Sequence, residues 1–315
     1  MTPLNRLLIL TPDAQRYHEL LRAQQPPDLE ISICPQRTAN DMALGQATII
    51  LGEPGHVAPV LARAGRLKWV QSTFAGVEAL CRPDLPRNYR LTGVKGVFGP
   101  SMTEYVFAHI LSLERHLAEM RANQQAKRWQ RHAYGLLRKR TLGLCGLGAI
   151  GRYIAQTAAH FGMTVVAFKR TPGSDPLVER IYTGNEFGAF LGRLDYLVLT
   201  LPQTPASTHL INARTLAMLK PSAVLINIGR SNAVAEADLI AALSKGRIRG
   251  AVLDVFDQEP LPRDNPLWEL PNAVITPHQA GISFPENILP IFMENYRRFL
   301  AGAPLKYEID FIRGY

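Results

Sequence analysis

One stretch of the chain, CGLGAIGRYIAQTAAHFGMTVVAFKRT from Cys145 to Thr171, constrains the fold more than any other. Gly146, Gly148 and Gly151 form a G-x-G-x-x-G turn between an apolar run and a segment whose apolar residues recur at helical spacing. In such a turn the first glycine reverses the chain, the second admits a pyrophosphate to the backbone, and the third lets the helix pack on the strand. The helix N-terminus attracts the anion. The stretch therefore predicts a strand–helix–strand unit that binds a dinucleotide.

The residues after the second strand of this unit, Lys169, Arg170 and Thr171, indicate which dinucleotide binds. Sites for NAD place an acid here, which hydrogen-bonds the ribose hydroxyls and would repel a 2′-phosphate. Two cations and a hydroxyl donor suit a phosphate dianion instead. We expect NADP(H) to be preferred, with NAD(H) possible. The alternative is that both cations are only solvated at the end of a strand.

Short apolar runs bounded by turn residues recur along the chain and alternate with helical segments. The first hundred residues contain RLLIL, ISIC, ATIIL, LKWVQS and YRLTGV, and the later series contains TVVAF, LDYLVLTL, AVLINI, GAVLDVF and AVITPH. Runs of this length between helices indicate parallel sheets that are covered on both faces. An amphipathic helix over Pro285–Leu300 is expected to return the chain to the first domain.

The predicted fold class is α/β, with two doubly wound parallel-sheet domains. A Rossmann dinucleotide-binding domain, residues 101–285, is inserted into a flavodoxin-like substrate-binding domain made of residues 1–100 and 286–315. A long helix over Ser101–Trp129, with Ser101 and Glu104 as a capping box, is expected to connect them. Further helices are expected over Ala14–Gln24 and Val57–Ala64.

Composition narrows the class of protein. The formal charge of +9 favours anionic ligands, but the basic residues are scattered except in Lys127–Arg140, so nucleic acid is not the expected partner. Cys34, Cys81 and Cys145 form no CxxC pair, and neither disulfides nor a metal site is expected. No apolar run approaches the ~20 residues of a membrane-spanning helix. We expect a cytoplasmic protein that does not bind membranes.

The second half of the chain supplies groups for proton exchange and for holding a carboxylate. They lie in the segments INIGRSNAV, LDVFDQEPLP and ITPHQAG. With WVQSTFAGVEAL, GLGAIGR, LTLPQTPASTHLIN and NPLWELPNAVITPHQAG in this order, nearly the whole chain resembles the D-isomer-specific 2-hydroxyacid dehydrogenase family, in its glyoxylate/hydroxypyruvate reductase-like branch. Many linked motifs in one order are more specific than any single motif.

The resemblance implies three catalytic residues, Arg230, Glu259 and His278. His278 is expected to protonate the carbonyl oxygen as hydride arrives, while Glu259 pairs with the imidazolium and favours the acid form. The planar fork of Arg230 would hold the carboxylate and carbonyl of a 2-oxo acid.

Other positions follow from the same resemblance. Ala75 and Gly76 would bind the substrate carboxylate through their backbone, and Asp254 would contact the nicotinamide carboxamide. The cofactor site would comprise Gly146, Gly148, Ala149, Ile150, Gly151, Lys169, Arg170, Thr171, Leu201, Pro202, Ile228, Gly229, Arg230, Asp254, His278, Ala280 and Gly281. Two departures from the family pattern are the missing acid after the second strand and the pair Ser231–Asn232 in place of glycines, which is expected to alter the floor of the site.

The expected function is NADPH-dependent reduction of a small anionic 2-oxo acid, with glyoxylate or hydroxypyruvate favoured. A reductase for bulkier 2-oxo acids is the alternative within the same class. A binding protein that senses the dinucleotide without catalysis is the alternative from another class, because fold alone does not imply function. The resemblance also implies a symmetric homodimer formed mainly through the cofactor domain.

Overall fold

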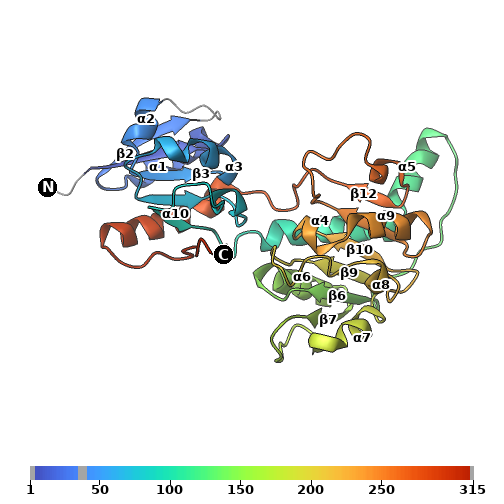
Figure 1. Ribbon diagram of the computed structural model, residues 1–315. Coiled ribbons are helices and arrows are strands. Elements are labelled where there is room, and N and C mark those ends of the chain that lie inside the picture. The colour runs from blue at the N-terminus through green and yellow to red at the C-terminus, as the bar shows by residue number, and fades with distance from the viewer. Residues whose placement is uncertain (1–3, 35–40, 313–315) are drawn as a thin grey trace. The chain divides into compact units, whose positions relative to one another are not determined.

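The computed structural model describes residues 4–34 and 41–312, and it divides into two compact units. Unit 1 consists of Met1–Val97 and Ser283–Tyr315, and unit 2 of Phe98–Ile282 (Figure 1). The sequence analysis placed the divisions three residues later, after residues 100 and 285. Residues 1–3, 35–40 and 313–315 of the predicted first domain lie outside the described residues.

Unit 1 is built on a five-stranded sheet with the order β2-β1-β3-β4-β5, in which every pair is parallel. Its strands are β1 (Asn5–Leu10), β2 (Leu29–Cys34), β3 (Ile49–Gly52), β4 (Trp69–Ser72) and β5 (Arg90–Thr92). This is the flavodoxin-like order, with the chain reversing direction across the sheet between β1 and β3. The prediction of a doubly wound first domain is confirmed.

The helices of unit 1 include one from the far end of the chain. They are α1 (Ala14–Gln24), α2 (Asp41–Gln46), α3 (Pro54–Val57), α10 (Pro285–Leu300) and two 3₁₀ turns, Ala58–Arg63 and Glu78–Leu80. The ring of Phe292 on α10 stacks on Trp69 of β4 with centroids 5.2 Å apart. Asn295 donates a 3.1 Å hydrogen bond to Gln71 in the buried interior. The predicted return of the last helix to the first domain is confirmed.

Unit 2 is built on a seven-stranded sheet with the order β12-β11-β10-β9-β6-β7-β8, again entirely parallel. Its strands are β6 (Thr141–Cys145), β7 (Thr164–Phe168), β8 (Arg180–Tyr182), β9 (Tyr196–Leu199), β10 (Val224–Asn227), β11 (Gly250–Leu253) and β12 (Ala273–Ile275). From β6 the chain first adds β7 and β8 on one side, and it then crosses to add β9 and the later strands on the other side. This is the Rossmann arrangement, and its switch point lies between β6 and β9.

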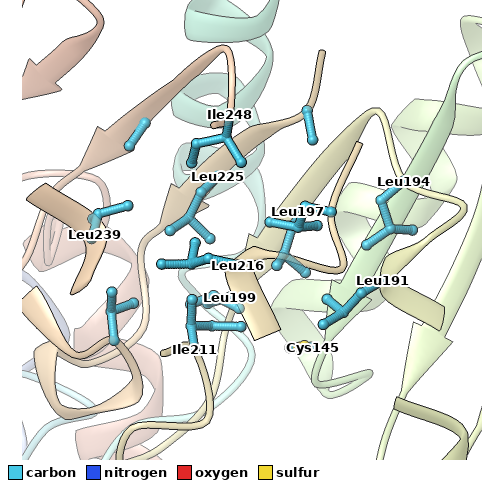
Figure 2. Close-up of a cluster of buried hydrophobic side chains, with 14 of the residues drawn as sticks. Cys145, Leu191, Leu194, Leu197, Leu199, Ile211, Leu216, Leu225, Leu239 and Ile248 are labelled. Atoms are coloured by element: carbon cyan, nitrogen blue, oxygen red, sulfur yellow. The ribbon is translucent and has the colours of Figure 1, made fainter. Parts of the chain in front are cut away.

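Helices cover both faces of this sheet. They are α4 (Gly99–Glu114), α5 (Leu117–Gln125), α6 (Ala149–His160), α7 (Phe187–Leu191), α8 (Ala213–Leu216) and α9 (Glu236–Ser244), with 3₁₀ turns at Gly184–Glu186, Ser231–Ala233 and Pro266–Glu269. Figure 2 shows part of the apolar core on one face, where Leu197, Leu199 and Leu225 of the strands meet Leu216 of α8 and Leu239 of α9. On the other face α4 packs against α6.

The predicted connecting helix over Ser101–Trp129 is wrong in two respects. It breaks at His116, which has a φ of 52°, so α4 and α5 are separate helices. The capping box is also wrong, because α4 begins at Gly99 with Pro100 in its first turn, a favoured position for proline. Ser101 therefore lies inside the helix and donates to the Phe98 carbonyl. Beyond Gln125 the chain continues without regular structure to Thr141.

Two smaller expectations also differ from the structure. Val57–Ala64 is mostly a 3₁₀ turn rather than a helix, and the short edge strand β8 was not predicted. Among the described residues, no helix combines the length and apolar character needed to cross a membrane.

Candidate active site

The glycine turn connects β6 to α6, and its geometry explains each glycine. Gly146 has a φ of 100°, and a Cβ there would lie 2.7 Å from Thr200 Oγ1. A Cβ on Gly151 would overlap the carbonyl oxygen of Gly146, so neither position accepts a side chain. Gly148 precedes the first residue of α6 and has open space around it. The space in front of the free amides at the start of α6 is thus not blocked by a side chain, and a pyrophosphate could bind there.

Thr200, a residue that the sequence analysis missed, holds this turn from the neighbouring strand. Its hydroxyl lies 3.2 Å from the carbonyl oxygen of Cys145 and 3.1 Å from that of Gly146. A threonine at the end of an apolar strand gives no separate signal in the sequence, because its partners come from a strand that is distant along the chain.

The predicted cofactor residues after β9 and β10 lie close together. A Cβ on Gly229 would be 2.8 Å from the carbonyl oxygen of Leu201, so a side chain there would separate the two segments. Asn227 shapes the turn that leads to Arg230: its Oδ1 accepts from the Gly229 amide at 3.2 Å and its Nδ2 donates to the Arg230 carbonyl at 3.1 Å. Arg230 also bonds the Gly229 carbonyl through Nη1.

The basic turn, by which we mean Lys169, Arg170 and Thr171, lies beside the glycine turn at the end of β7. The Gly146 amide donates to the Phe168 carbonyl at 3.0 Å, so the two turns begin at neighbouring backbone positions. Lys169 is half-buried, whereas Arg170 and Thr171 are exposed. All three residues are therefore at least partly exposed to solvent.

His278 and Glu259 form the central contact of the site. Nδ1 of His278 lies 2.9 Å from Oε2 of Glu259, and Oε1 of Glu259 accepts the Phe256 amide at 2.9 Å. A carboxylate only accepts hydrogen bonds, so Nδ1 carries the proton in this contact. The other ring nitrogen, Nε2, is then the one available for proton exchange, and the imidazole is half-exposed.

The backbone of His278 adopts a φ of 52°, which is unusual for a residue with a side chain. The carboxylate of Asp254 stabilises this backbone conformation. Its Oδ1 accepts the Gln279 amide at 2.9 Å and its Oδ2 the Ala280 amide at 2.8 Å, while Thr276 donates to Oδ1 from the other flank. Backbone conformations of this kind persist where the surroundings over-determine them.

Asp254 was expected to contact the nicotinamide carboxamide. In the structure it is 1% exposed, and its oxygens accept hydrogen bonds on both flanks of His278. Its observed contacts are therefore with the loop that carries His278, and its contact with the nicotinamide carboxamide stays a prediction. Ala280 is buried and donates to Asp254, and Gly281 packs on Met102.

A second missed residue, Tyr105 of α4, extends this network. Its hydroxyl lies 2.6 Å from Thr276 Oγ1. Because Thr276 gives its only hydrogen to the Asp254 carboxylate, Tyr105 must be the donor. Burial raises the pKa of Tyr105 to about 12, so it remains a donor at neutral pH. The chain of bonds runs from Tyr105 through Thr276 and Asp254 to the amides beside His278.

The catalytic candidates share one edge of the sheet. Arg230 follows β10, Asp254 follows β11 and His278 follows β12, and these three strands are neighbours. Ligands of open α/β sheets bind at the carboxyl ends of the strands, where the glycine turn after β6 also lies. The arrangement can bind a dinucleotide and exchange a proton beside it.

Comparison with known proteins decides the family. Residues 107–280 match the family model described as "D-isomer specific 2-hydroxyacid dehydrogenase, NAD binding domain". The chain belongs to the D-isomer specific 2-hydroxyacid dehydrogenase family. As a 2-hydroxyacid dehydrogenase it is an oxidoreductase, and the resemblance noted in the sequence is confirmed.

Relatives of this 2-hydroxyacid dehydrogenase support the same branch. A glyoxylate/hydroxypyruvate reductase A from Photorhabdus laumondii is 34% identical over 81% of this chain and 84% of its own. A family member from Aeromonas salmonicida has a crystal structure with a TM-score of 0.96, 43% identity and coverage of 98% of this chain and 99% of that chain. An NADPH-dependent glyoxylate/hydroxypyruvate reductase from Sinorhizobium meliloti, in complex with NADP and sulfate, has a TM-score of 0.83 and 29% identity, covering 99% of this chain and all of that chain.

The departure at Ser231–Asn232 has a structural explanation in this 2-hydroxyacid dehydrogenase. Asn232 donates to Thr208 Oγ1 at 3.0 Å, and the His209 amide donates to the Asn232 carbonyl at 2.7 Å. The side chain is thus used to hold the segment after Pro202, where Ser207 also bonds the Pro202 carbonyl. The asparagine fixes the loop that carries two predicted cofactor residues.

In unit 1, the dehydrogenase's predicted carboxylate-binding residues Ala75 and Gly76 follow β4. The loop before them is held by Ser72, whose hydroxyl accepts the Phe74 amide at 3.0 Å and donates to the Phe74 carbonyl at 2.7 Å. Ser283 donates to the Thr73 carbonyl at 2.6 Å. The loop is thereby preorganised, which lowers the cost of binding an anion through its backbone.

Proposed function

We propose that this protein reduces a small 2-oxo acid to the 2-hydroxy acid with NADPH, with glyoxylate or hydroxypyruvate as the favoured substrates. The observation that carries the proposal is the 2.9 Å contact between His278 and Glu259 at the dinucleotide-binding edge of unit 2. The relative from Sinorhizobium meliloti, named for this activity, supports the substrate class.

His278 is the proposed general acid. Glu259 holds Nδ1, so the protonated ring presents its Nε2 proton to the carbonyl oxygen of the substrate. The bound cofactor supplies a hydride to the carbonyl carbon. The proton from His278 completes the hydroxyl group, and the ring regains a proton from solvent, to which it is half-exposed.

Arg230 and the loop of Ala75 and Gly76 are the proposed substrate-binding groups. A guanidinium presents two parallel N–H donors that match a carboxylate or a carbonyl oxygen beside it. Backbone amides in a preorganised loop bind a carboxylate without adding a charge of their own. Each of these groups favours anionic 2-oxo acids over neutral carbonyl compounds.

The proposed cofactor is NADP(H), with NAD(H) as a weaker ligand. Gly146, Gly148 and Gly151 leave the start of α6 open for the pyrophosphate, and Lys169, Arg170 and Thr171 provide cations and a hydroxyl where an acid would select NAD. The Sinorhizobium meliloti relative was solved in complex with NADP.

One experiment separates this function from its alternatives. The fall in NADPH absorbance is followed after addition of glyoxylate, hydroxypyruvate or phenylpyruvate, with NADPH alone as the blank. We expect the highest kcat/KM with one of the two small acids. A higher value with phenylpyruvate would favour a reductase for bulkier acids, and no oxidation with any acid despite NADPH binding would favour a dinucleotide-sensing protein.

We further propose a homodimer formed mainly through unit 2. Large apolar side chains are exposed on α5 and the segment after it, namely Leu117, Met120, Trp129, Tyr134 and Leu136. The segment is held against the helices, because Asn123 bonds His132 at 2.9 Å and Arg115 lies 4.2 Å from the Tyr134 ring centroid. A fixed apolar surface of this kind favours protein–protein contact.

A further inference from the structure

The turn that carries the basic residues is anchored at both of its ends. It leaves β7 at Lys169, whose amide donates to the Tyr182 carbonyl at 3.2 Å. Six residues later, Asp175 forms an ion pair with Arg152 of α6. Lys169, Arg170 and Thr171 therefore lie between a sheet anchor and a helix anchor.

Asp175 is the better buried partner of this ion pair. Its side chain is 7% exposed, against 50% for Arg152. While Oδ2 meets Arg152, Oδ1 accepts the Leu177 amide at 3.1 Å, and the Asp175 carbonyl accepts the Val178 amide at 3.1 Å. The carboxylate of Asp175 thus bonds both to the backbone of its own turn and to Arg152 of α6.

Arg152 comes directly after Gly151, in the first half of the helix whose N-terminus is the proposed pyrophosphate site. The ion pair therefore connects the basic turn to the element that would hold the other phosphates. Within the turn, the Lys169 ammonium lies 3.8 Å from where a Cβ on Gly173 would be, and Gly173 has a φ of 151°. A side chain at Gly173 would strain the backbone of this turn.

We propose that Arg152 and Asp175 are positioning residues for recognition of the 2′-phosphate of NADP(H). The ion pair holds Lys169, Arg170 and Thr171 at a fixed distance from the start of α6, so that one ligand meets both sites. Neither residue of the pair needs to contact the phosphate. The inference rests on the proposed preference for NADP(H), and it assigns a role to two residues to which the sequence analysis gave none.

The test uses adenosine 2′,5′-bisphosphate and 5′-AMP, which differ only in the 2′-phosphate, and measures their Kd values by calorimetry. The wild-type protein should bind the bisphosphate more tightly. Arg152→Gln and Asp175→Asn should each weaken bisphosphate binding about two- to fivefold, the range for a half-exposed ion pair, and leave 5′-AMP binding unchanged. The double variant should be no weaker than the weaker single variant, because the two changes break one interaction.

The direction of the Asp175→Asn effect is informative. Removing an acid makes the protein more positive, so long-range attraction alone would tighten anion binding. Arg180→Gln is the matched control for Arg152→Gln, since Arg180 also forms a half-exposed ion pair in unit 2, with Glu186. It changes the net charge equally and should leave the ratio of the two Kd values unchanged.

Three results would overturn the inference. Tighter bisphosphate binding by Asp175→Asn would mean that the acid repels the phosphate. A further loss when Arg152→Gln is added to Asp175→Asn would mean that Arg152 contacts the ligand directly. Unchanged Kd values in both single variants would leave the pair without a role. A wild-type protein that does not distinguish the two nucleotides would instead refute the proposed cofactor preference, and the inference with it.

Discussion

Nδ1 of His278 and Oε2 of Glu259 lie 2.9 Å apart, and the opposite oxygen of Glu259 is held by the Phe256 amide. The backbone therefore holds the carboxylate of Glu259 in place, and this carboxylate orients the imidazole ring of His278. This contact between segments that follow β11 and β12 orients the ring of His278, the proposed general acid.

We expect His278→Ala and Glu259→Gln to lower turnover of the 2-oxo acid by ~10² to 10⁴-fold, the range for general acid catalysis. NADPH affinity should change little, because neither residue is placed at the phosphates. Stopped-flow turnover and fluorescence titration of NADPH measure the two quantities. His160→Ala on α6 is the control, since its ring bonds the Gln156 carbonyl of its own helix. Full activity in the His278 variant would remove that residue from the reaction.

Lys169→Asp should shift the ratio of kcat/KM for NADPH and NADH toward NADH. The new acid would accept from the ribose hydroxyls and repel a 2′-phosphate. Charge-assisted hydrogen bonds contribute roughly 1.5 to 3 kcal/mol each, so loss of one or two should change the ratio by about tenfold to several hundredfold. Arg170→Ala should lower the ratio in the same direction. A ratio unaffected by Lys169→Asp would mean that the basic turn is merely solvated.

Tyr105→Phe should lower kcat about fivefold while KM for the 2-oxo acid stays constant. The change keeps the ring, which lies 4.4 Å from that of His109, and removes the hydrogen bond to Thr276, worth about 1 kcal/mol. Steady-state kinetics gives the split between kcat and KM. Tyr153→Phe, on α6, serves as the control because its ring covers Gly99, away from Thr276. Equal kcat in both variants would show that the Tyr105 hydroxyl does not support the catalytic loop.

Glu114 should contribute stability that disappears in acid. Burial raises the pKa of this carboxyl, but hydrogen bonds from Tyr196 and Arg249 and the nearby Arg140 outweigh it, so the pKa is lower than usual. A carboxyl with a depressed folded-state pKa stabilises the protein above its unfolded pKa of about 4.3 and loses this effect as the pH falls through the folded value.

The free energy of unfolding of wild type and Glu114→Gln, measured in urea at several pH values, checks this expectation. The free energy of unfolding of the wild type should exceed that of the variant at pH 7, and this difference should become smaller below about pH 4.3. Glu104→Gln, which changes an exposed glutamate on α4, is the comparison for loss of one negative charge. A gap that stays constant down to pH 3 would show that the Glu114 charge does not stabilise the fold.

Trp129→Ser should weaken a dimer by at least about 30-fold, because truncating a central interface tryptophan often costs 2 kcal/mol or more. Its side chain is 99% exposed in the single chain. Sedimentation should show wild-type particles of twice the 34.9 kDa chain mass at micromolar concentration. Trp268→Ser is the control, being half-exposed with its ring N–H bonded to the Pro262 carbonyl. A monomeric wild type would refute the proposed interface.

Much of the fold followed from local patterns. Strands such as Ile49–Gly52 are apolar runs between turn residues, and α6 shows helical spacing after a glycine motif. The break at His116 was not predictable, because apolar residues continue through it and neither glycine nor proline marks it. Its left-handed backbone is stabilised by neighbours from elsewhere, including the His132 ring stacked 5.4 Å away.

The candidate site shows the same limit. His278 and Glu259 were paired through family motifs, and the structure places them in contact. Tyr105 was not identified, since its partner Thr276 lies 171 residues further along the chain. The assignment of Asp254 to the nicotinamide carboxamide stays a prediction, and its hydrogen bonds with Thr276 and two backbone amides were not anticipated. These contacts depend on which strand ends lie next to one another in the sheet. The local spacing of residues in the sequence does not show that.

Because α10 supplies Phe292 and Asn295 to the sheet of unit 1, the strands of that sheet are synthesised before the helix that packs on them, and unit 2 is translated in between. Phe98–Ile282 is continuous and can fold as it emerges. At common elongation rates, translation of this unit takes on the order of 10 to 40 s, during which Trp69 has no partner from α10. Until α10 has been synthesised, the nascent first unit therefore leaves the apolar surface around Trp69 uncovered.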